Sequence, residues 1–167
     1  MNSFNTSTRM LNTANNNYYW TFYIQSDNTL TLYNQSGLGP YYSYNGASWS
    51  HNSDLRIKRD INPISSAIND ILKLNPVYFN YNYDSPDQPM RPGFIAQEVE
   101  LLFPSLVSNS SYSEELKDHI KGICTTELIP YLVKSIQEQQ IQIESLKSDI
   151  SDIKSQLQKM NLSSTNM

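Results

Sequence analysis

Residues 129–160, IPYLVKSIQEQQIQIESLKSDISDIKSQLQKM, carry the clearest periodic pattern in the sequence. Two sets of apolar side chains each recur in it every seven residues, and a single glutamine interrupts the second set. Such a pattern, sustained over more than four heptads and flanked by Gln, Glu, Lys, Ser and Asp, predicts a coiled-coil helix. The two seam positions are occupied by Ile129, Leu132, Ile136, Gln139, Ile143, Leu146, Ile150, Ile153, Leu157 and Met160.

The residue types in the seam indicate how many chains join. Isoleucine dominates one seam position and the other mixes leucine with isoleucine, a pattern that favours three strands over two. Gln139 would sit in the core and fix the register at some cost in stability. The alternative is one amphipathic helix packed on its own domain, but a 3.5-residue repeat of this length exceeds an ordinary packed helix. We therefore expect a homotrimer.

The residues before this helix predict a small mixed domain. Asn75-Pro76 and Pro104 end predicted helices. We expect a strand and turn over 105–113, and mostly helix from Tyr112 onward, with Pro130 tolerated only in a first turn or at a kink. The remaining segments are a helix over 65–74, a strand over 77–81, a loop over 84–92 and a short helix over 97–103.

The first fifty residues have a different composition, because Arg9 and Asp27 are their only charged residues. Residues 19–25 and 30–33 predict a β-hairpin, a break over 37–40 follows, and 41–44 predict a further short strand. Residues 1–17 are interpreted as a flexible or partner-dependent tail. Two or three strands alone cannot bury enough apolar surface to be stable, and we therefore expect this region to need neighbouring chains.

Together these segments predict an α+β protein with a β-rich N-terminal fibre segment, a small mixed α/β domain and a long C-terminal helix that forms a trimeric coiled coil. The predicted boundaries are 1–52 for the fibre segment, 53–128 for the mixed domain, 129–160 for the coiled coil and 161–167 for a flexible tail.

Composition excludes several classes of function. The net charge is −4 and the pI about 5.1, which provides no electrostatic footprint for nucleic acid or an anionic membrane. No apolar run reaches the ~20 residues of a membrane span, and the first residues do not form a signal peptide. The single cysteine, Cys124, permits no intrachain disulfide. His51 and His119 lie far apart without a carboxylate cluster, so we expect no metal and no cofactor. We interpret Cys124 as a small packed residue on a helix and His119 as a helix-surface residue.

The junction HNSDLRIKRDI, residues 51–61, offers a serine nucleophile, Ser53, and a lysine, Lys58, that could act as its base. An ordinary lysine has a pKa of about 10.4, and lowering it by about three units takes roughly 4 kcal/mol. Burial against Ile57 and Ile61, or a nearby arginine, could supply this. Residues five apart point to opposite faces of a strand, so the two side chains meet only if the chain bends or if they belong to different subunits.

Five motifs in order then resemble one family: Ser53-Asp54 with Lys58 and INPI at 61–64, LNPVYFNY at 74–81, GFIAQEVE at 93–100, FPSLV at 103–107, and the terminal coiled coil. Together they resemble the intramolecular chaperone auto-processing domain found at the C-terminus of phage endosialidase tailspikes, tail fibres and neck appendages. A relative occurs in the myelin regulatory factor. The resemblance covers about residues 52–160.

The resemblance implies a domain that trimerises, assists the folding of the fibre before it and cuts itself off. By analogy, the scissile bond is Asn52–Ser53, the nucleophile is Ser53, the general base is Lys58, and Asp54 matches the residue that usually follows the serine. The N-terminal segment is then the folding client, and the expected location is a virion fibre or the host cytoplasm during assembly. The fibre segment is short for the family.

Two other functions stay open. The first is a non-cleaving trimerisation foot on a viral receptor-binding fibre, in which Ser53 and Lys58 are inert. The second is a released trimeric transcription factor like the myelin protein, but the chain has no basic DNA-binding module.

Overall fold

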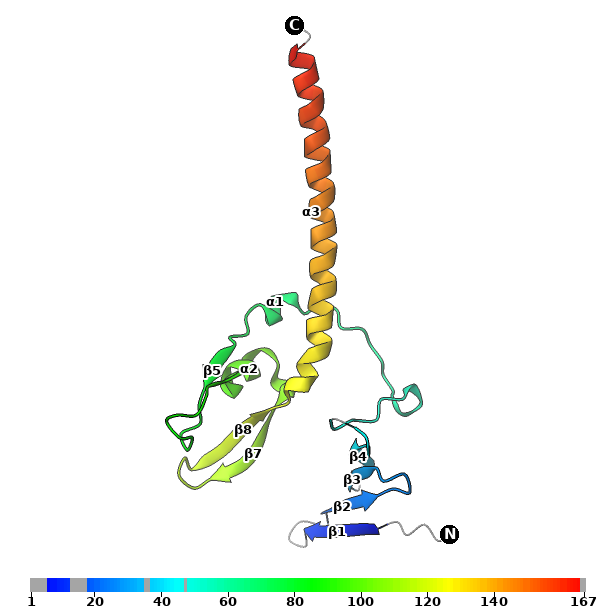
Figure 1. The fold of residues 1–167 in the computed structure, drawn as a ribbon, viewed down its shortest axis with the longest axis vertical. Coiled ribbons are helices and arrows are strands. Elements are labelled where there is room, and N and C mark those ends of the chain that lie inside the picture. The colour runs from blue at the N-terminus through cyan, green and yellow to red at the C-terminus, as the bar shows by residue number, and fades with distance from the viewer. Residues whose placement is uncertain (1–5, 13–17, 35–36, 47, 166–167) are drawn as a thin grey trace. The chain divides into compact units, whose positions relative to one another are not determined.

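The computed structural model describes residues 6–12, 18–34, 37–46 and 48–165 (Figure 1). Contacts divide the chain into two compact units, residues 1–62 and residues 63–167, and each is described by itself. The first unit is β-rich, and the second combines short helices and strands with a long C-terminal helix. The predicted mixed architecture with these two ends is therefore confirmed.

The first unit contains an antiparallel sheet in the order β1-β2-β3-β4, made of β1 (Thr6–Asn12), β2 (Tyr18–Ile24), β3 (Leu30–Asn34) and β4 (Gly37–Tyr42). The predicted hairpin is β2–β3, which pairs Ile24 with Leu30. Its turn is held by the Asp27 carboxylate, which accepts the backbone N–H of Thr29 at 3.0 Å. Asn28 has a φ of 65°, a conformation that asparagine tolerates better than most residues.

Two expectations for this region are wrong. Part of the predicted flexible tail, residues 6–12, is strand β1, because it pairs with β2 along its whole length; residues 1–5 and 13–17 lie outside the described residues. The predicted break over 37–40 is instead the start of β4. Gly39 permits this, because a Cβ there would collide with the carbonyl oxygen of Leu32 on β3.

The two faces of this sheet differ in character. Strand alternation and register put the even-numbered side chains of β2 and β3 on one face, which is largely apolar. The other face carries threonines and tyrosines, among them Thr31, which is 1% exposed. The apolar face remains open to solvent in this chain. Its half-exposed members are Met10, Trp20, Phe22 and Ile24.

The second unit is built around a small apolar core. Val99 lies in α2, and Phe103 is the C-cap of that helix. Both pack against Leu106 and against Leu128, the first residue of the last helix. The elements are α1 (Ile68–Ile71), β5 (Val77–Phe79), β6 (Arg91–Gly93), α2 (Ala96–Leu102), η2 (Pro104–Leu106), β7 (Val107–Ser113), β8 (Asp118–Ile123), η3 (Thr125–Glu127) and α3 (Leu128–Thr165). The strands form two antiparallel pairs, β5-β6 and β7-β8.

The expectation of helix from Tyr112 onward is wrong up to residue 124. β7 and β8 pair from Val107–Ile123 to Ser113–Asp118, so this part is a hairpin. His119 accordingly lies exposed on β8, not on a helix surface, and Cys124 is an exposed N-cap of η3, not a packed helical residue. The helix predicted over 65–74 shortens to α1, and the end of the predicted loop over 84–92 enters β6.

The last helix, α3, is continuous over 38 residues, and Pro130 falls in its first turn, where no helical hydrogen bond is lost. It continues through Thr165, so the predicted tail over 161–167 begins as helix. In the described part of the chain, no helix is both long and apolar enough to cross a membrane.

Candidate functional site

The chain after Ser53 makes one tight turn. Asp54 is the N-cap of the 3₁₀ helix η1 (Leu55–Ile57), and its carboxylate accepts the backbone N–H of Arg56 at 2.8 Å. The same carboxylate takes two hydrogen bonds from the guanidinium of Arg56, at 2.9 and 2.7 Å. The turn closes when the backbone N–H of Lys58 donates to the carbonyl of Leu55 at 3.2 Å. Asp54 therefore shapes the chain between the predicted nucleophile and base.

This turn brings Ser53 and Lys58 together within one chain. The Lys58 Nζ donates a hydrogen bond to the Ser53 Oγ at 2.7 Å. A straight strand would hold the two side chains on opposite faces, so the bend at η1 is what permits the contact. The distance is within the range that proton transfer between a nucleophile and its base requires.

Charge at the turn is balanced by Asp54 and Arg56. Side-chain hydrogen bonds from Arg56, and then its backbone N–H, lower the pKa of the Asp54 carboxyl, and the same ion pair raises the pKa of Arg56. Asp54 thus stays ionised as a cap to a lower pH than an aspartate without these hydrogen bonds. Both partners are largely exposed, so the pair acts mainly on the local geometry.

The junction is open to water in the single chain. Ile57 is 64% and Ile61 is 61% exposed, and Lys58 is exposed too, so the burial that could favour a neutral Lys58 is not provided by these two residues. Residues 51–62 are all exposed, so the elements of their own unit leave the Ser53–Lys58 pair hydrated.

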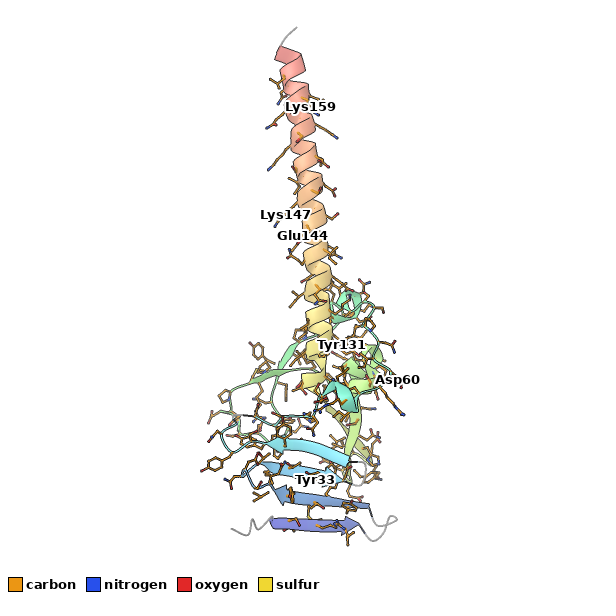
Figure 2. All side chains as sticks on the ribbon, turned by 90° about the vertical axis from the view of Figure 1, so that its right-hand side faces the viewer. Tyr33, Asp60, Tyr131, Glu144, Lys147 and Lys159 are labelled. Carbon is orange, nitrogen blue, oxygen red and sulfur yellow. The ribbon has the colours of Figure 1, made fainter. Side chains whose placement is uncertain are left out.

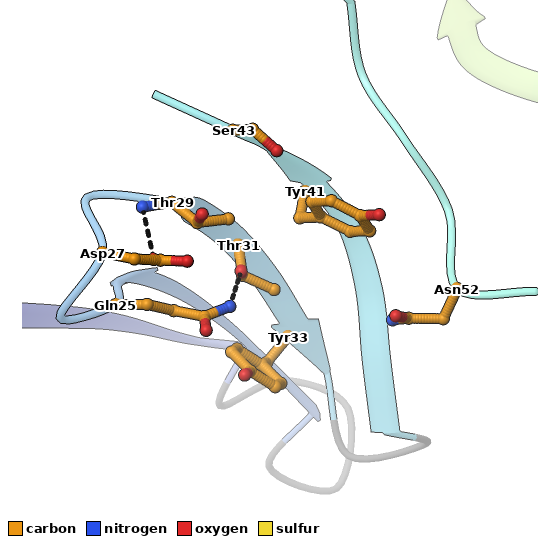
Figure 3. Close-up of a pocket in the computed structure, with 8 residues that line it drawn as sticks. All are labelled: Gln25, Asp27, Thr29, Thr31, Tyr33, Tyr41, Ser43 and Asn52. Carbon is orange, nitrogen blue, oxygen red and sulfur yellow. Dashed lines mark hydrogen bonds between the residues drawn. The ribbon is translucent and has the colours of Figure 1, made fainter. Parts of the chain in front are cut away.

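Upstream of Asn52, the chain returns to the edge of the sheet. Ser50 and Tyr41 form an isolated antiparallel bridge, and Asn52 lines a polar hollow of about 380 Å³ (Figure 3). The hollow was not predicted from the sequence, because the residues that line it come from segments that are separated along the chain. The lining residues are Gln25, Asp27, Thr29, Thr31, Tyr33, Tyr41, Ser43 and Asn52.

The predicted seam of α3 is exposed along its whole length. Every residue from 139 to 162 is exposed, and this part of the helix, with Glu144 and Lys147, extends beyond the rest of its unit (Figure 2). The exposed fraction of the apolar seam side chains lies between 44% at Leu132 and 65% at Met160.

A different face of α3 packs on the mixed domain. Leu128 is buried in the core, the Tyr131 ring lies 4.9 Å from that of Phe103, and Ser135 is 5% exposed. These positions flank the seam in the heptad and do not belong to it. The described core of the domain therefore packs on a face of α3 other than the seam.

Among the residues that the structure describes, no group of three or more His, Cys, Asp or Glu side chains lies close enough together to bind a metal ion.

Comparison with known families gives one match. Residues 53–108 match the model of a peptidase family described as "Chaperone of endosialidase". The match begins at Ser53, the residue that follows the predicted scissile bond, and ends in β7. No curated protein matches the chain.

Proposed function

We propose that the chain is a self-cleaving intramolecular chaperone of a viral fibre, because residues 53–108 match the endosialidase chaperone family, which supports a chaperone role. It assembles as a homotrimer, assists folding of the β-rich segment before it and cuts the Asn52–Ser53 bond. The observation that supports this most directly is the 2.7 Å contact between Lys58 Nζ and Ser53 Oγ.

The reaction needs no group beyond these residues and water. Neutral Lys58 takes the Ser53 hydroxyl proton as Oγ attacks the Asn52 carbonyl carbon. The C–N bond to Ser53 breaks, the amine takes that proton from Lys58, and an ester joins the Asn52 acyl group to Ser53 Oγ. Water then hydrolyses the ester to the Asn52 carboxylate. Because nucleophile and carbonyl are neighbours in one chain, the effective molarity can reach about 10⁵ M or more.

Assembly would supply the missing desolvation. Lysine acts as a base near neutral pH only when its charged form is destabilised, and one chain leaves Ile57 and Ile61 exposed beside it. Copies of the chain that cover this junction would bury the pair. Cleavage would then follow trimer formation and report that assembly is complete.

The trimer itself is proposed from α3. The isoleucines of its seam are exposed, and isoleucine in these positions favours three strands. Three joined helices hold the N-terminal segments at an effective concentration of roughly millimolar. Each N-terminal segment exposes an apolar face of its sheet, and we expect the same segments of the other two chains to pack against it. A tethered search of this kind avoids the slow, aggregation-prone pairing of separate chains.

The test is a boiled, denaturing gel of the purified full chain with intact-mass measurement. We expect a 52-residue and a 115-residue piece of the 167-residue chain. Ser53→Ala should leave the chain whole, and Ser65→Ala, the same change at an exposed serine outside the junction, should leave cleavage unchanged. One uncut wild-type band from a trimeric sample would contradict the cleavage.

The second candidate is the non-cleaving trimerisation foot. The full exposure of residues 51–62 favours it, because a hydrated lysine is a poor base at neutral pH. The same gel separates the two functions.

A further inference from the structure

The segment just before the proposed scissile bond is docked on the sheet of the client. Ser50 and Tyr41 exchange two backbone hydrogen bonds: Tyr41 N–H donates to the Ser50 carbonyl at 2.9 Å, and Ser50 N–H donates to the Tyr41 carbonyl at 2.8 Å. β4 is the last strand of the sheet, so this bridge adds a short piece of chain to its outer edge.

A ring contact reinforces the same docking. Tyr42 and Trp49 meet edge to face, with ring centroids 5.7 Å apart. The chain reverses between them in a turn closed by the Gly46 N–H, which donates to the Ser43 carbonyl at 2.8 Å. Such an aromatic pair typically contributes ~0.5–1.5 kcal/mol beyond the area it buries.

Asn52, two residues after the bridge, lies at the polar hollow of the same sheet. Figure 3 shows its side chain reaching toward β4 beside Tyr41. The opposite wall is ordered by two hydrogen bonds, from Gln25 Nε2 to Thr31 Oγ1 at 2.9 Å and from Thr29 N–H to Asp27 at 3.0 Å. The hollow exists only when β3 and β4 are paired.

We propose that the client sheet positions the scissile bond: β4 holds residues 49 and 50, the hollow receives Asn52, and a chain is cut only after its own β3–β4 hairpin has folded. This inference rests on the proposed cleavage and adds positioning residues to it, namely Tyr42 and Trp49. The client thereby takes part in the reaction that releases it.

The physical reason is that the bond is fixed from both sides. Downstream, Asp54 and η1 fix Ser53 relative to Lys58. Upstream, the docking of Ser50 on β4, two residues before the bond, restrains the position of the Asn52 carbonyl. Attack requires the reacting atoms about 3–3.5 Å apart and aligned, and a displacement of about 1 Å can cost 10²-fold in rate. An undocked segment would leave the carbonyl free to rotate away from the Ser53 Oγ.

The first experiment measures the cleavage rate of pulse-labelled full-length chains by intact mass. Trp49→Ala and Tyr42→Ala should slow cleavage about tenfold or more while sedimentation still shows trimers, and Trp49→Phe should restore much of the rate. Tyr44→Ala is the matched control, because Tyr44 is 72% exposed in the adjoining turn. Trp49→Ala cleaving at the wild-type rate would overturn the inference. An uncut wild type would instead overturn the proposed function.

The second experiment covers the case in which loss of the ring disturbs the sheet. Residues 41 and 50 exchange both hydrogen bonds, so their Cα atoms are about 5.5 Å apart, which a disulfide can span. Trp49→Ala is combined with Tyr41→Cys, Ser50→Cys and Cys124→Ser. Oxidation should restore cleavage and reduction should slow it again. Equal rates in the oxidised and reduced chains would contradict positioning by the sheet edge.

Discussion

Glu138 on α3 accepts a hydrogen bond from the backbone N–H of Ile68 at 3.0 Å, across seventy residues of sequence. The same carboxylate oxygen accepts the N–H of Ala67 at 3.2 Å. One side chain of the long helix therefore satisfies two backbone donors at the start of α1 and joins α1 to α3.

We expect this tie to weaken in acid. The Ile68 hydrogen bond is the main cause that lowers the pKa of Glu138 from its ordinary value of about 4.5. A lowered pKa in the folded state means that the stabilisation is complete above about pH 4.5 and is lost as the pH falls through the folded value. The protection of the Ala67, Ile68 and Ile71 amides from hydrogen exchange should therefore decrease as the pH is lowered below about 4.5.

Glu138→Gln should remove much of that pH dependence, because the amide does not titrate there. Glu144→Gln, on the exposed part of the same helix, is the control and should leave it unchanged. Identical acid profiles for wild type and Glu138→Gln would refute the assignment.

Lys58→Arg should abolish cleavage although it preserves a positive charge and a donor near Ser53. A guanidinium is not deprotonated in proteins, so it cannot accept the hydroxyl proton. Loss of a general base typically costs about 10²–10⁴-fold, which intact mass of purified protein detects over hours. Arg59→Lys, at an exposed neighbour, is the control. Cleavage by Lys58→Arg would assign Lys58 a purely electrostatic role.

Asp54→Ala should slow cleavage several-fold, because the cap that bends the chain toward Lys58 is lost. Asp54→Asn keeps an acceptor for the Arg56 N–H but loses the ion pair, so its rate should lie close to that of the wild type. The comparison separates the cap from the charge. Equal slowing of both variants would show that the ion pair matters more than the cap.

Ile143→Asp with Ile150→Asp should abolish trimers and cleavage together, since both residues are in the exposed seam. Ser145→Asp with Ser148→Asp adds the same charge outside the seam and should leave both intact. Sedimentation and the gel report the two properties separately. Cleavage that persists in monomers would reject gating by assembly.

Leu106→Ala should destabilise the mixed domain by about 2–5 kcal/mol, because the side chain is 3% exposed in the core. Leu101→Ala is the matched control, since Leu101 is 85% exposed, and should change the free energy of unfolding by less than about 0.5 kcal/mol. Both are measured by urea unfolding in the uncut Ser53→Ala chain. A similar loss of unfolding free energy in both variants would contradict the assignment of Leu106 to the core.

What the sequence predicts well here is local. The heptads over 129–160 repeat every seven residues and need no distant partner to indicate a helix. The β2–β3 hairpin likewise follows from alternating aromatic residues and a turn at Asp27. The condition on Ser53 and Lys58, that the chain must bend between them, could also be stated from spacing alone, and η1 meets it.

What could not be predicted depends on distant partners. Residues 6–12 are mostly polar and lack the alternation of a strand, and they become strand β1 by pairing with β2. Gly122 is the one residue of 118–123 that disfavours a helix, too weak a signal on its own to predict a strand, and the segment becomes β8 through pairing with β7. The hollow at Asn52 joins side chains from β3, β4 and the turn at Asp27, and no short motif marks such a site.

The bridge between Tyr41 and Ser50 also shapes the product. If the chain is cut after Asn52, the released segment keeps Ser50 paired with Tyr41 on the outer edge of β4. An open outer strand is a template on which foreign strands stack into aggregates. The released fibre would instead have this edge blocked at Tyr41, with a new charged C-terminal carboxylate two residues beyond Ser50 that disfavours the addition of another strand.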